Sequence, residues 1–308
     1  MIDALGAAGA AATACLDGIP DRVADHLPSR SMATLTARDG VALHVRTWEP
    51  SGAARGTVVL VHGLGEHAGR YGHVAAPLSA DGWRVVAHDH RGHGQSAGPR
   101  AGLAERDDLL VDLAQVVDEH RGDGPLVLLG HSLGGTVAAR FVAEGLEPTP
   151  APWHRPVDAL VLTSPAFDLG MNPVQKGLLA VLGPLAPNLA VGNGLDPKWI
   201  SRDPAVVDAY KADPLVHDRV TGRLVRFLVD AGRHVREKAA AWELPTLLLW
   251  AGADRVVAPS GSAEFAAAAP ATVVESHEYP QCFHEVLNEP EQGEVLGEIR
   301  AWLAGRGS

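Results

Sequence analysis

One short stretch, LVLLGHSLGG at residues 126–135, places a serine in a tight turn directly after an apolar run. The run predicts a buried strand, and the glycines on both sides of Ser132 leave room for a close turn. The pattern Gly-x-Ser-x-Gly between a strand and a helix is typical of a nucleophile elbow, which lifts the serine hydroxyl above a parallel sheet. The stretch therefore favours an α/β fold with an exposed reactive serine.

Apolar runs alternate with helix-like segments along most of the chain. Two alternating runs flank Asp39-Gly40 and predict a hairpin over 31–50. Buried strands are predicted at 56–63, 83–89, 125–130, 158–164, 245–252 and 272–279, and helices at 105–121, 134–145 and 293–304. This order predicts an α/β fold whose sheet is mostly parallel, with helices on both faces and an antiparallel edge.

The alternation is interrupted once, from about residue 164 to residue 242. This part is helical, is broken by Pro and Gly, and contains the uncharged stretch GLLAVLGPLAPNLAVGNGL at 177–195. The two prolines inside that stretch argue against a membrane span. Ligands of such folds bind at the carboxyl edge of the sheet. We therefore expect a helical cap (lid) at 164–242, a core at 31–163 and 243–308, and an N-terminal extension at 1–30.

Composition narrows the classes of function. The chain has 37 acidic and 26 basic residues, a net charge of −11, which argues against a nucleic-acid partner. Cys15 and Cys282 do not suggest a disulfide framework and fit a reducing compartment. The N-terminus lacks the basic start and long apolar core of a secretory signal, so we expect a cytoplasmic protein. No spacing suggests a metal, and GHGQSAG at 92–98 lacks the pattern of a dinucleotide loop.

A serine nucleophile needs a base, and the base needs an orienting carboxylate. In this type of fold the acid and then the histidine follow the serine along the chain. Asp254 lies just after the strand at 245–252 and is the candidate acid, with Asp168 as the alternative. His284 lies in the loop after the last strand and is the candidate base, whereas His277 falls inside that strand.

Acyl transfer also needs two N–H groups that face the developing negative oxygen. The residue after the nucleophile, Leu133, supplies one of them. The other is expected from the loop VHGLGEHAGRY at 61–71, where Leu64 is the candidate and Gly63 the alternative. The side chain of Leu64 plays no part in such a donation, because the backbone donates.

Six motifs in the same order resemble one known family. They are HGLGEHAGRY, DHRGHGQSAG, GHSLGG, SRDPAVVDAYKADPLV, AGADRVV and FHEVLNEPE. Together they resemble the monoacylglycerol lipase and lysophospholipase branch of the α/β-hydrolase superfamily. The resemblance implies an α/β-hydrolase fold and a serine hydrolase of single-chain acyl esters that needs no cofactor. It also implies the triad Ser132, Asp254 and His284, with Leu64 and Leu133 as oxyanion donors.

The resemblance further implies that Glu66 and Arg70 lie near the alcohol end of the pocket; the alternative is that they form an ion pair that braces their loop. Mammalian members carry a second histidine just beyond the catalytic one, and HEVLNEP lacks it. Leu178 and Leu179, in the uncharged stretch, are expected to line a channel for the acyl chain, and the alternative is that they pack the cap onto the sheet.

The expected function is hydrolysis of a small-molecule acyl ester, a monoacylglycerol or a lysophospholipid, through an acyl-enzyme. A broader carboxylesterase acting on xenobiotic or phthalate-type monoesters is the alternative, and a noncatalytic ligand-binding relative is a third. The cap is expected to make transient, peripheral contact with a lipid surface, while the oligomeric state is left open.

Overall fold

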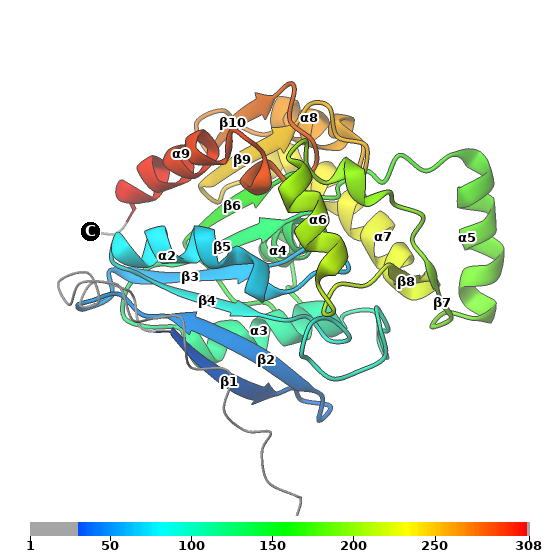
Figure 1. Ribbon diagram of the computed structural model, residues 1–308, viewed down its shortest axis with the longest axis horizontal. Coiled ribbons are helices and arrows are strands. Elements are labelled where there is room, and N and C mark those ends of the chain that lie inside the picture. The colour runs from blue at the N-terminus through cyan, green and yellow to red at the C-terminus, as the bar shows by residue number, and fades with distance from the viewer. Residues whose placement is uncertain (1–29, 307–308) are drawn as a thin grey trace, which may run out of the picture.

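The computed structural model describes residues 30–306 and is built around an eight-stranded sheet (Figure 1). The strands are β1 (Arg30–Thr36), β2 (Ala42–Trp48), β3 (Gly56–Val61), β4 (Trp83–His88), β5 (Leu126–His131), β6 (Ala159–Thr163), β9 (Thr246–Ala251) and β10 (Val274–Tyr279). Their order across the sheet is β1-β2-β4-β3-β5-β6-β9-β10. Among these described strands, the β1–β2 and β2–β4 pairs are antiparallel and the others are parallel. The predicted parallel sheet with an antiparallel edge is confirmed.

Helices cover both faces of the sheet. One face carries α2 (Gly72–Ala80) and α9 (Gln292–Ala304), and the other carries α3 (Asp108–His120), α4 (Leu133–Ala143), α7 (Gly222–Lys238) and α8 (Pro259–Ala268). Successive side chains of a strand point to opposite faces. In β5, Leu126 and Leu128 therefore join one apolar cluster, while Val127 and Leu129 join the other. This two-sided burial explains why the central strands read as continuous apolar runs.

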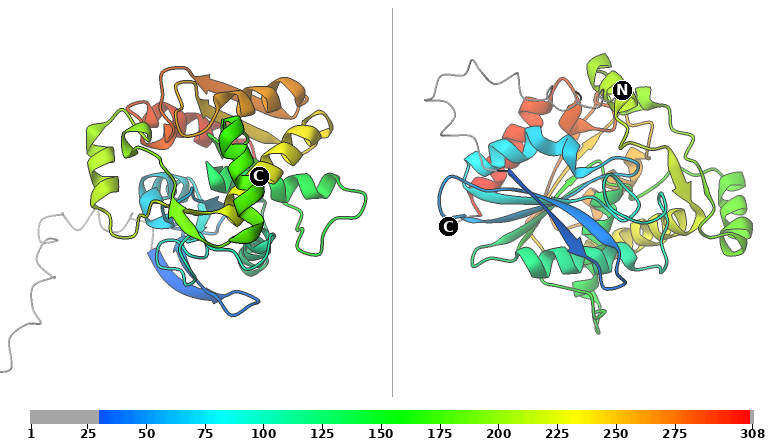
Figure 2. Two further views of the ribbon diagram at one scale, coloured as in Figure 1. Left: turned by 90° about the vertical axis from the view of Figure 1, so that its right-hand side faces the viewer. Right: turned by 60° about the horizontal axis from the view of Figure 1, so that its bottom comes forward.

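The chain between β6 and β9 rises above the carboxyl ends of the strands (Figures 1 and 2). It contains α5 (Pro173–Leu185), β7 (Ala190–Gly192), a short 3-10 helix (Pro197–Trp199), α6 (Pro204–Ala212), β8 (Arg219–Thr221) and then α7. β7 and β8 form a small antiparallel sheet of their own. Asp203 accepts a hydrogen bond from Ala205 N–H, and Pro204 follows it, so the SRDP motif starts α6.

The last helix before β9 differs from the others in this region. Phe227, Leu228, Ala231 and Val235 of α7 are buried and belong to the same apolar cluster as α4. α7 thus covers the sheet, whereas α5 stands apart from it (Figure 2). The division into a core and a cap at 164–242 remains a prediction.

Two sequence predictions remain, one on the N-terminal extension and one on the uncharged stretch that was weighed as a membrane span. The N-terminal extension 1–30, with Cys15, lies outside the described residues apart from Arg30, which begins β1. Among the described residues, no helix is both long and apolar enough to cross a membrane.

Candidate active site

Ser132 lies at the sharp turn between β5 and α4. Its φ of 53° and ψ of −119° are unusual for a residue with a side chain. The turn needs glycine on both sides: a Cβ on Gly130 would lie 2.6 Å from Gly134 O, and a Cβ on Gly134 would lie 2.0 Å from Val61 O. The local sequence therefore holds Ser132 in a strained conformation of the kind found at nucleophile elbows.

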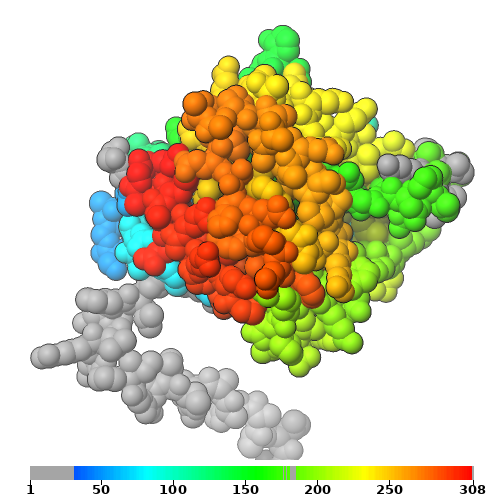
Figure 3. Space-filling view, turned by 90° about the horizontal axis from the view of Figure 1, so that it is seen from above, coloured from blue at the N-terminus to red at the C-terminus, as the bar shows by residue number. Residues whose placement is uncertain are grey.

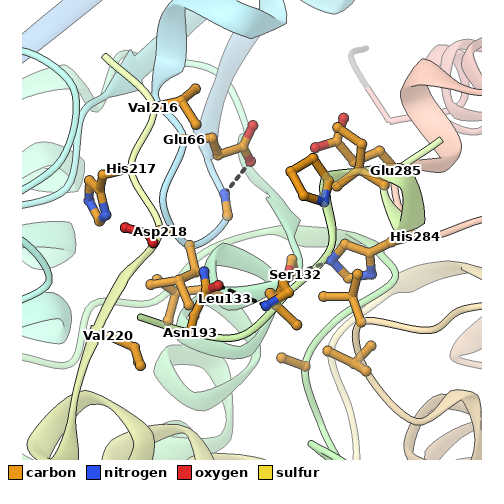
Figure 4. Close-up of a pocket in the computed structure, with 18 of the residues that line it drawn as sticks. Glu66, Ser132, Leu133, Asn193, Val216, His217, Asp218, Val220, His284 and Glu285 are labelled. Carbon is orange, nitrogen blue, oxygen red and sulfur yellow. Dashed lines mark hydrogen bonds between the residues drawn. The ribbon is translucent and has the colours of Figure 1, made fainter. Parts of the chain in front are cut away.

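His284 connects Ser132 to Asp254. His284 Nε2 lies 2.8 Å from Ser132 Oγ (Figure 4), and His284 Nδ1 lies 2.7 Å from Asp254 Oδ2. The other oxygen, Asp254 Oδ1, accepts the N–H groups of Val256 and Val257 at 2.7 and 3.1 Å. Both partners are buried, with 5% of the His284 side chain and 1% of the Asp254 side chain exposed. The geometry is that of a serine, a base and an orienting acid.

Electrostatics around His284 favour its protonated form. Burial lowers the pKa of His284, but the Asp254 carboxylate outweighs burial and raises this pKa above its ordinary value. The ring of His131 lies 4.9 Å from the ring of His284, and burial lowers the pKa of His131 to about 4. His131 is therefore neutral near pH 7 and does not repel a positive charge on His284.

Activity should rise with pH because His284 must be neutral to accept a proton from Ser132. Since the pKa of His284 is raised, we expect kcat/KM to be lost as the pH falls through a midpoint above about 6.5, the usual histidine value. A kcat/KM profile from pH 5 to 9 on an uncharged ester tests this. A flat profile, or a midpoint near pH 4, would contradict the assignment of His284 as base.

The loop after β3 is held by the buried carboxylate of Glu66. The Gly63 N–H and the Tyr71 hydroxyl both donate to Glu66 Oε1, each at 2.6 Å. The Gly63 N–H thus already donates a hydrogen bond within the protein, to Glu66, and is not available to a substrate oxygen. Within the described part of the chain, the N–H groups of Leu64 and Leu133 donate to no protein acceptor. Of the two candidates for the loop donor, this arrangement favours Leu64.

Arg70 lies between two carboxylates. Its guanidinium is 2.5 Å from Glu66 Oε2 and makes two hydrogen bonds of 2.7 Å to Glu285, and it stacks over the Tyr210 ring at 4.8 Å. Burial would raise the pKa of Glu66, but Arg70 outweighs it and the pKa is lowered. Glu66 and Arg70 therefore form the ion pair that the sequence left as an alternative, and one cation between two anions leaves a net negative charge.

A cavity of about 450 Å³ opens at Ser132. Part of its wall is apolar and includes Ala166, Leu169, Leu228, Val256 and Val257. Among the described residues that line it, five carboxylates and one lysine carry charge: Glu66, Asp196, Lys211, Asp213, Asp218 and Glu285. Figure 4 shows Glu66 and Glu285 on one side of Ser132 and Val220 on the other. The site thus offers a polar, acidic side and an apolar side to one molecule.

The remaining candidates from the sequence lie elsewhere. Asp168 Oδ1 accepts Gly170 N–H at 2.9 Å, and His277 lies in β10 with Nδ1 3.0 Å from Glu298. Leu179 lines a second, smaller cavity of about 240 Å³, which shares Leu169, Met171 and Leu228 with the first. The side chain of Leu178 lies outside the described part of the structure.

Two residues of the site were missed by sequence reasoning. Glu285 follows His284 directly, and Tyr210 lies in the YKADPLV part of the cap motif. The position of Glu285 next to the candidate base was the one signal in the sequence for that residue. No spacing rule links Glu285 or Tyr210 to Arg70, so their contacts with Arg70 could not be predicted.

One group of described residues brings potential metal ligands together, namely Cys282, Glu289 and Glu291, whose ligand atoms lie within 4.8 Å of one another. The guanidinium of Arg202 contacts all three side chains. A cation supplied by the protein already occupies this cluster, and burial raises the pKa of the Cys282 thiol to about 12, so the donor set does not fit a metal.

The chain is similar to several known proteins. Residues 52–291 match the model of the family described as serine aminopeptidase, S33. The chain is 37% identical to the monoacylglycerol lipase of Mycolicibacterium smegmatis over 281 residues, which cover 89% of this chain and 97% of the relative. It is 33% identical to the monoglyceride lipase of Rattus norvegicus over 298 residues, which cover 93% and 95%.

Solved structures give the same result. The monoacylglycerol lipase of Paleococcus ferrophilus superimposes with a TM-score of 0.76 at 34% identity, covering 86% of this chain and 99% of that one. A monoglyceride lipase of Saccharomyces cerevisiae superimposes with a TM-score of 0.78 at 20% identity, covering 92% and 96%, which supports the fold. The chain therefore belongs to the serine aminopeptidase S33 family and is an α/β-hydrolase of the branch that includes the monoacylglycerol lipases.

Proposed function

We propose that this hydrolase cleaves monoacylglycerols through an acyl-enzyme on Ser132. The observation that carries the proposal is the chain of hydrogen bonds Ser132–His284–Asp254, which opens on a cavity with one acidic and one apolar side. A relative named monoacylglycerol lipase, at 37% identity, and one named monoglyceride lipase, at 33%, support the same substrate class.

In the proposed mechanism, Ser132 Oγ attacks the ester carbonyl while His284 Nε2 accepts the hydroxyl proton. Asp254 holds the Nδ1–H of His284 and stabilises the imidazolium. The N–H groups of Leu64 and Leu133 donate to the oxygen of the tetrahedral intermediate. His284 then gives its proton to the leaving alcohol, and a water molecule, activated by the same histidine, releases the fatty acid.

The acidic side of the cavity favours a neutral alcohol. Glu66 and Glu285 share the single cation of Arg70, and Asp213 and Asp218 add further negative charge from the cap. A phosphate or a free carboxylate on the leaving group would meet this charge and be repelled. Hydroxyl groups of glycerol, in contrast, can donate hydrogen bonds to carboxylates. This favours monoacylglycerols over anionic lysophospholipids, whose phosphate is on the leaving alcohol.

The apolar side of the cavity suits one acyl chain, and each buried CH₂ contributes about 0.8 kcal/mol.

We also propose that the cap touches lipid surfaces transiently. Val174 and Leu185 on α5, and Leu189 and Val191 near it, are about half or more exposed, and exposed apolar patches mark such contact sites.

Hydrolysis of an ester panel tests the proposal. We expect kcat/KM to rise from two-carbon to at least eight-carbon monoacylglycerols, and triacylglycerols to be poor substrates. Esters of the same chain with a phosphate on the alcohol should react at least about tenfold more slowly, a difference of ~1.4 kcal/mol. Equal rates on phthalate monoesters would support the carboxylesterase alternative, and a preference for acetate would contradict an acyl channel.

A further inference from the structure

The cap segment 197–202, which runs into the SRDP motif and α6, lies along the loop that carries His284. Glu285 N–H donates to Ile200 O at 2.8 Å, and His284 N–H donates to Trp199 O at 3.4 Å. The next residue of the cap, Ser201, donates its hydroxyl to Asn288 O at 2.9 Å, three residues beyond Glu285. The backbone of the candidate base is thus hydrogen-bonded to the cap and not to the sheet. Figure 3 shows the two segments in contact, α6 and its approach in yellow-green against the C-terminal region in orange and red.

Hydrogen bonds between Arg202 and Glu289 also join the cap segment to the loop that carries His284. Glu289 is fully buried, and its Oε1 accepts Arg202 N–H at 2.5 Å. Glu289 Oε2 accepts the Arg202 guanidinium and also the Phe283 N–H, the latter at 3.1 Å. Phe283 directly precedes His284, so one buried carboxylate holds both the cap residue and the neighbour of the base. Arg202 extends the contact to Glu291.

The segment has a second side that faces the cavity. Pro197 and Ile200 line the pocket at Ser132, while their neighbours bind the histidine loop. A displacement of this segment would therefore change both the wall that meets substrate and the position of His284 Nε2. Such a coupling is expected to matter, because a catalytic group must be held within a fraction of an ångström of its working position.

We propose that Arg202 and Glu289 are positioning residues through which the cap holds His284 in place for proton transfer. This inference rests on the proposed role of His284 as the base. It predicts that loss of the Arg202–Glu289 pair slows the chemical step itself, on substrates that do not reach the cap as well as on those that do.

The experiment compares Arg202→Gln, Arg202→Lys and the isosteric Glu289→Gln with wild type. The control is Arg300→Gln, which removes a bidentate Arg–Asp pair between α9 and Asp81 at the end of α2, away from the cap (Figure 1). Each protein is assayed for kcat and KM on an acetyl ester and on a ten-carbon monoacylglycerol, and its thermal unfolding is measured.

We expect Arg202→Gln and Glu289→Gln to lower kcat about 10- to 100-fold on both esters. Arg202→Lys should fall between wild type and Arg202→Gln, since lysine keeps the charge but loses the two-pronged geometry. The midpoint of the kcat/KM profile should move to lower pH, because a displaced His284 loses part of its contact with Asp254. Arg300→Gln should change neither kcat nor the midpoint.

A rise in KM for the long ester, with an unchanged kcat on the acetyl ester and an unchanged midpoint, would overturn the inference, since it would mean that the pair only shapes the cap. If Arg202→Gln does not fold, Arg202→Lys and Glu289→Gln decide the question. Failure of the proposed function is recognised separately, because wild type itself would then fail to hydrolyse the ten-carbon monoacylglycerol, whatever its rate on the acetyl ester.

Discussion

Ser132→Ala should abolish ester hydrolysis and labelling by a fluorophosphonate while leaving the fold intact. The substitution removes the oxygen that lies 2.8 Å from His284 Nε2, and it takes away no apolar volume from the core. In a well-studied serine hydrolase, loss of the nucleophile lowers kcat by about a millionfold. We expect a loss of that order, measured as the steady-state rate on a ten-carbon monoacylglycerol.

Ser262→Ala is the matched control for this experiment. Ser262 is also buried, but it lies in α8 and does not line the cavity. It should keep its rate and its labelling, and both variants should unfold at temperatures close to that of wild type. Near-normal turnover by Ser132→Ala would show that the reaction does not use this serine.

The order of elements could be predicted from the chain because each depends on a local pattern. Strands β3, β5, β6 and β9 are buried on both faces, so each appears as an apolar run between turn residues. The turn at Ser132 was recognisable because its glycines are required by close backbone contacts. Asp254 and His284 could be proposed because strand ends of a parallel sheet meet at one edge.

The rest depends on contacts between distant residues, which no local pattern records. Arg70 and Glu285 are 215 positions apart, and Arg202 and Glu289 are 87 apart. Such pairs arise only once the cap and the histidine loop have been brought together. For the same reason the sequence could not distinguish a substrate contact from an ion pair for Glu66, nor foresee that its carboxylate holds Gly63 N–H.

These long-range contacts all involve residues close to His284 in the chain. Glu285 next to it binds Arg70 and, through Arg70, the Glu66 carboxylate that fixes the loop with the proposed oxyanion donor. Glu289 binds the cap on the other side. The residues on both sides of the proposed base, Phe283 and Glu285, are therefore each held by an ionic group outside Ser132, His284 and Asp254.

Asp254→Asn should also lower the rate by orders of magnitude, though by less than Ser132→Ala. The backbone N–H groups of Val256 and Val257 would take the oxygen of the new amide, because Asp254 Oδ1 accepts both of them. The amide NH₂ would then face His284 Nδ1 and require it to accept a hydrogen bond. The ring proton would move to Nε2, and the histidine could no longer take the proton of Ser132. The corresponding change in a well-studied triad lowers kcat about 10⁴-fold.

Asp168→Asn provides the control, since Asp168 is the alternative acid and its Oδ1 accepts only a local N–H, that of Gly170. It should stay within about threefold of wild type, the range of surface substitutions that change the barrier by less than ~0.7 kcal/mol. The residual activity of Asp254→Asn should titrate at a lower pH than that of wild type, because the Asp254 carboxylate is what raises the pKa of His284 against burial. If Asp168→Asn were the damaging change and Asp254→Asn the harmless one, the acid would have to be reassigned, and with it the direction in which His284 presents its proton-accepting nitrogen.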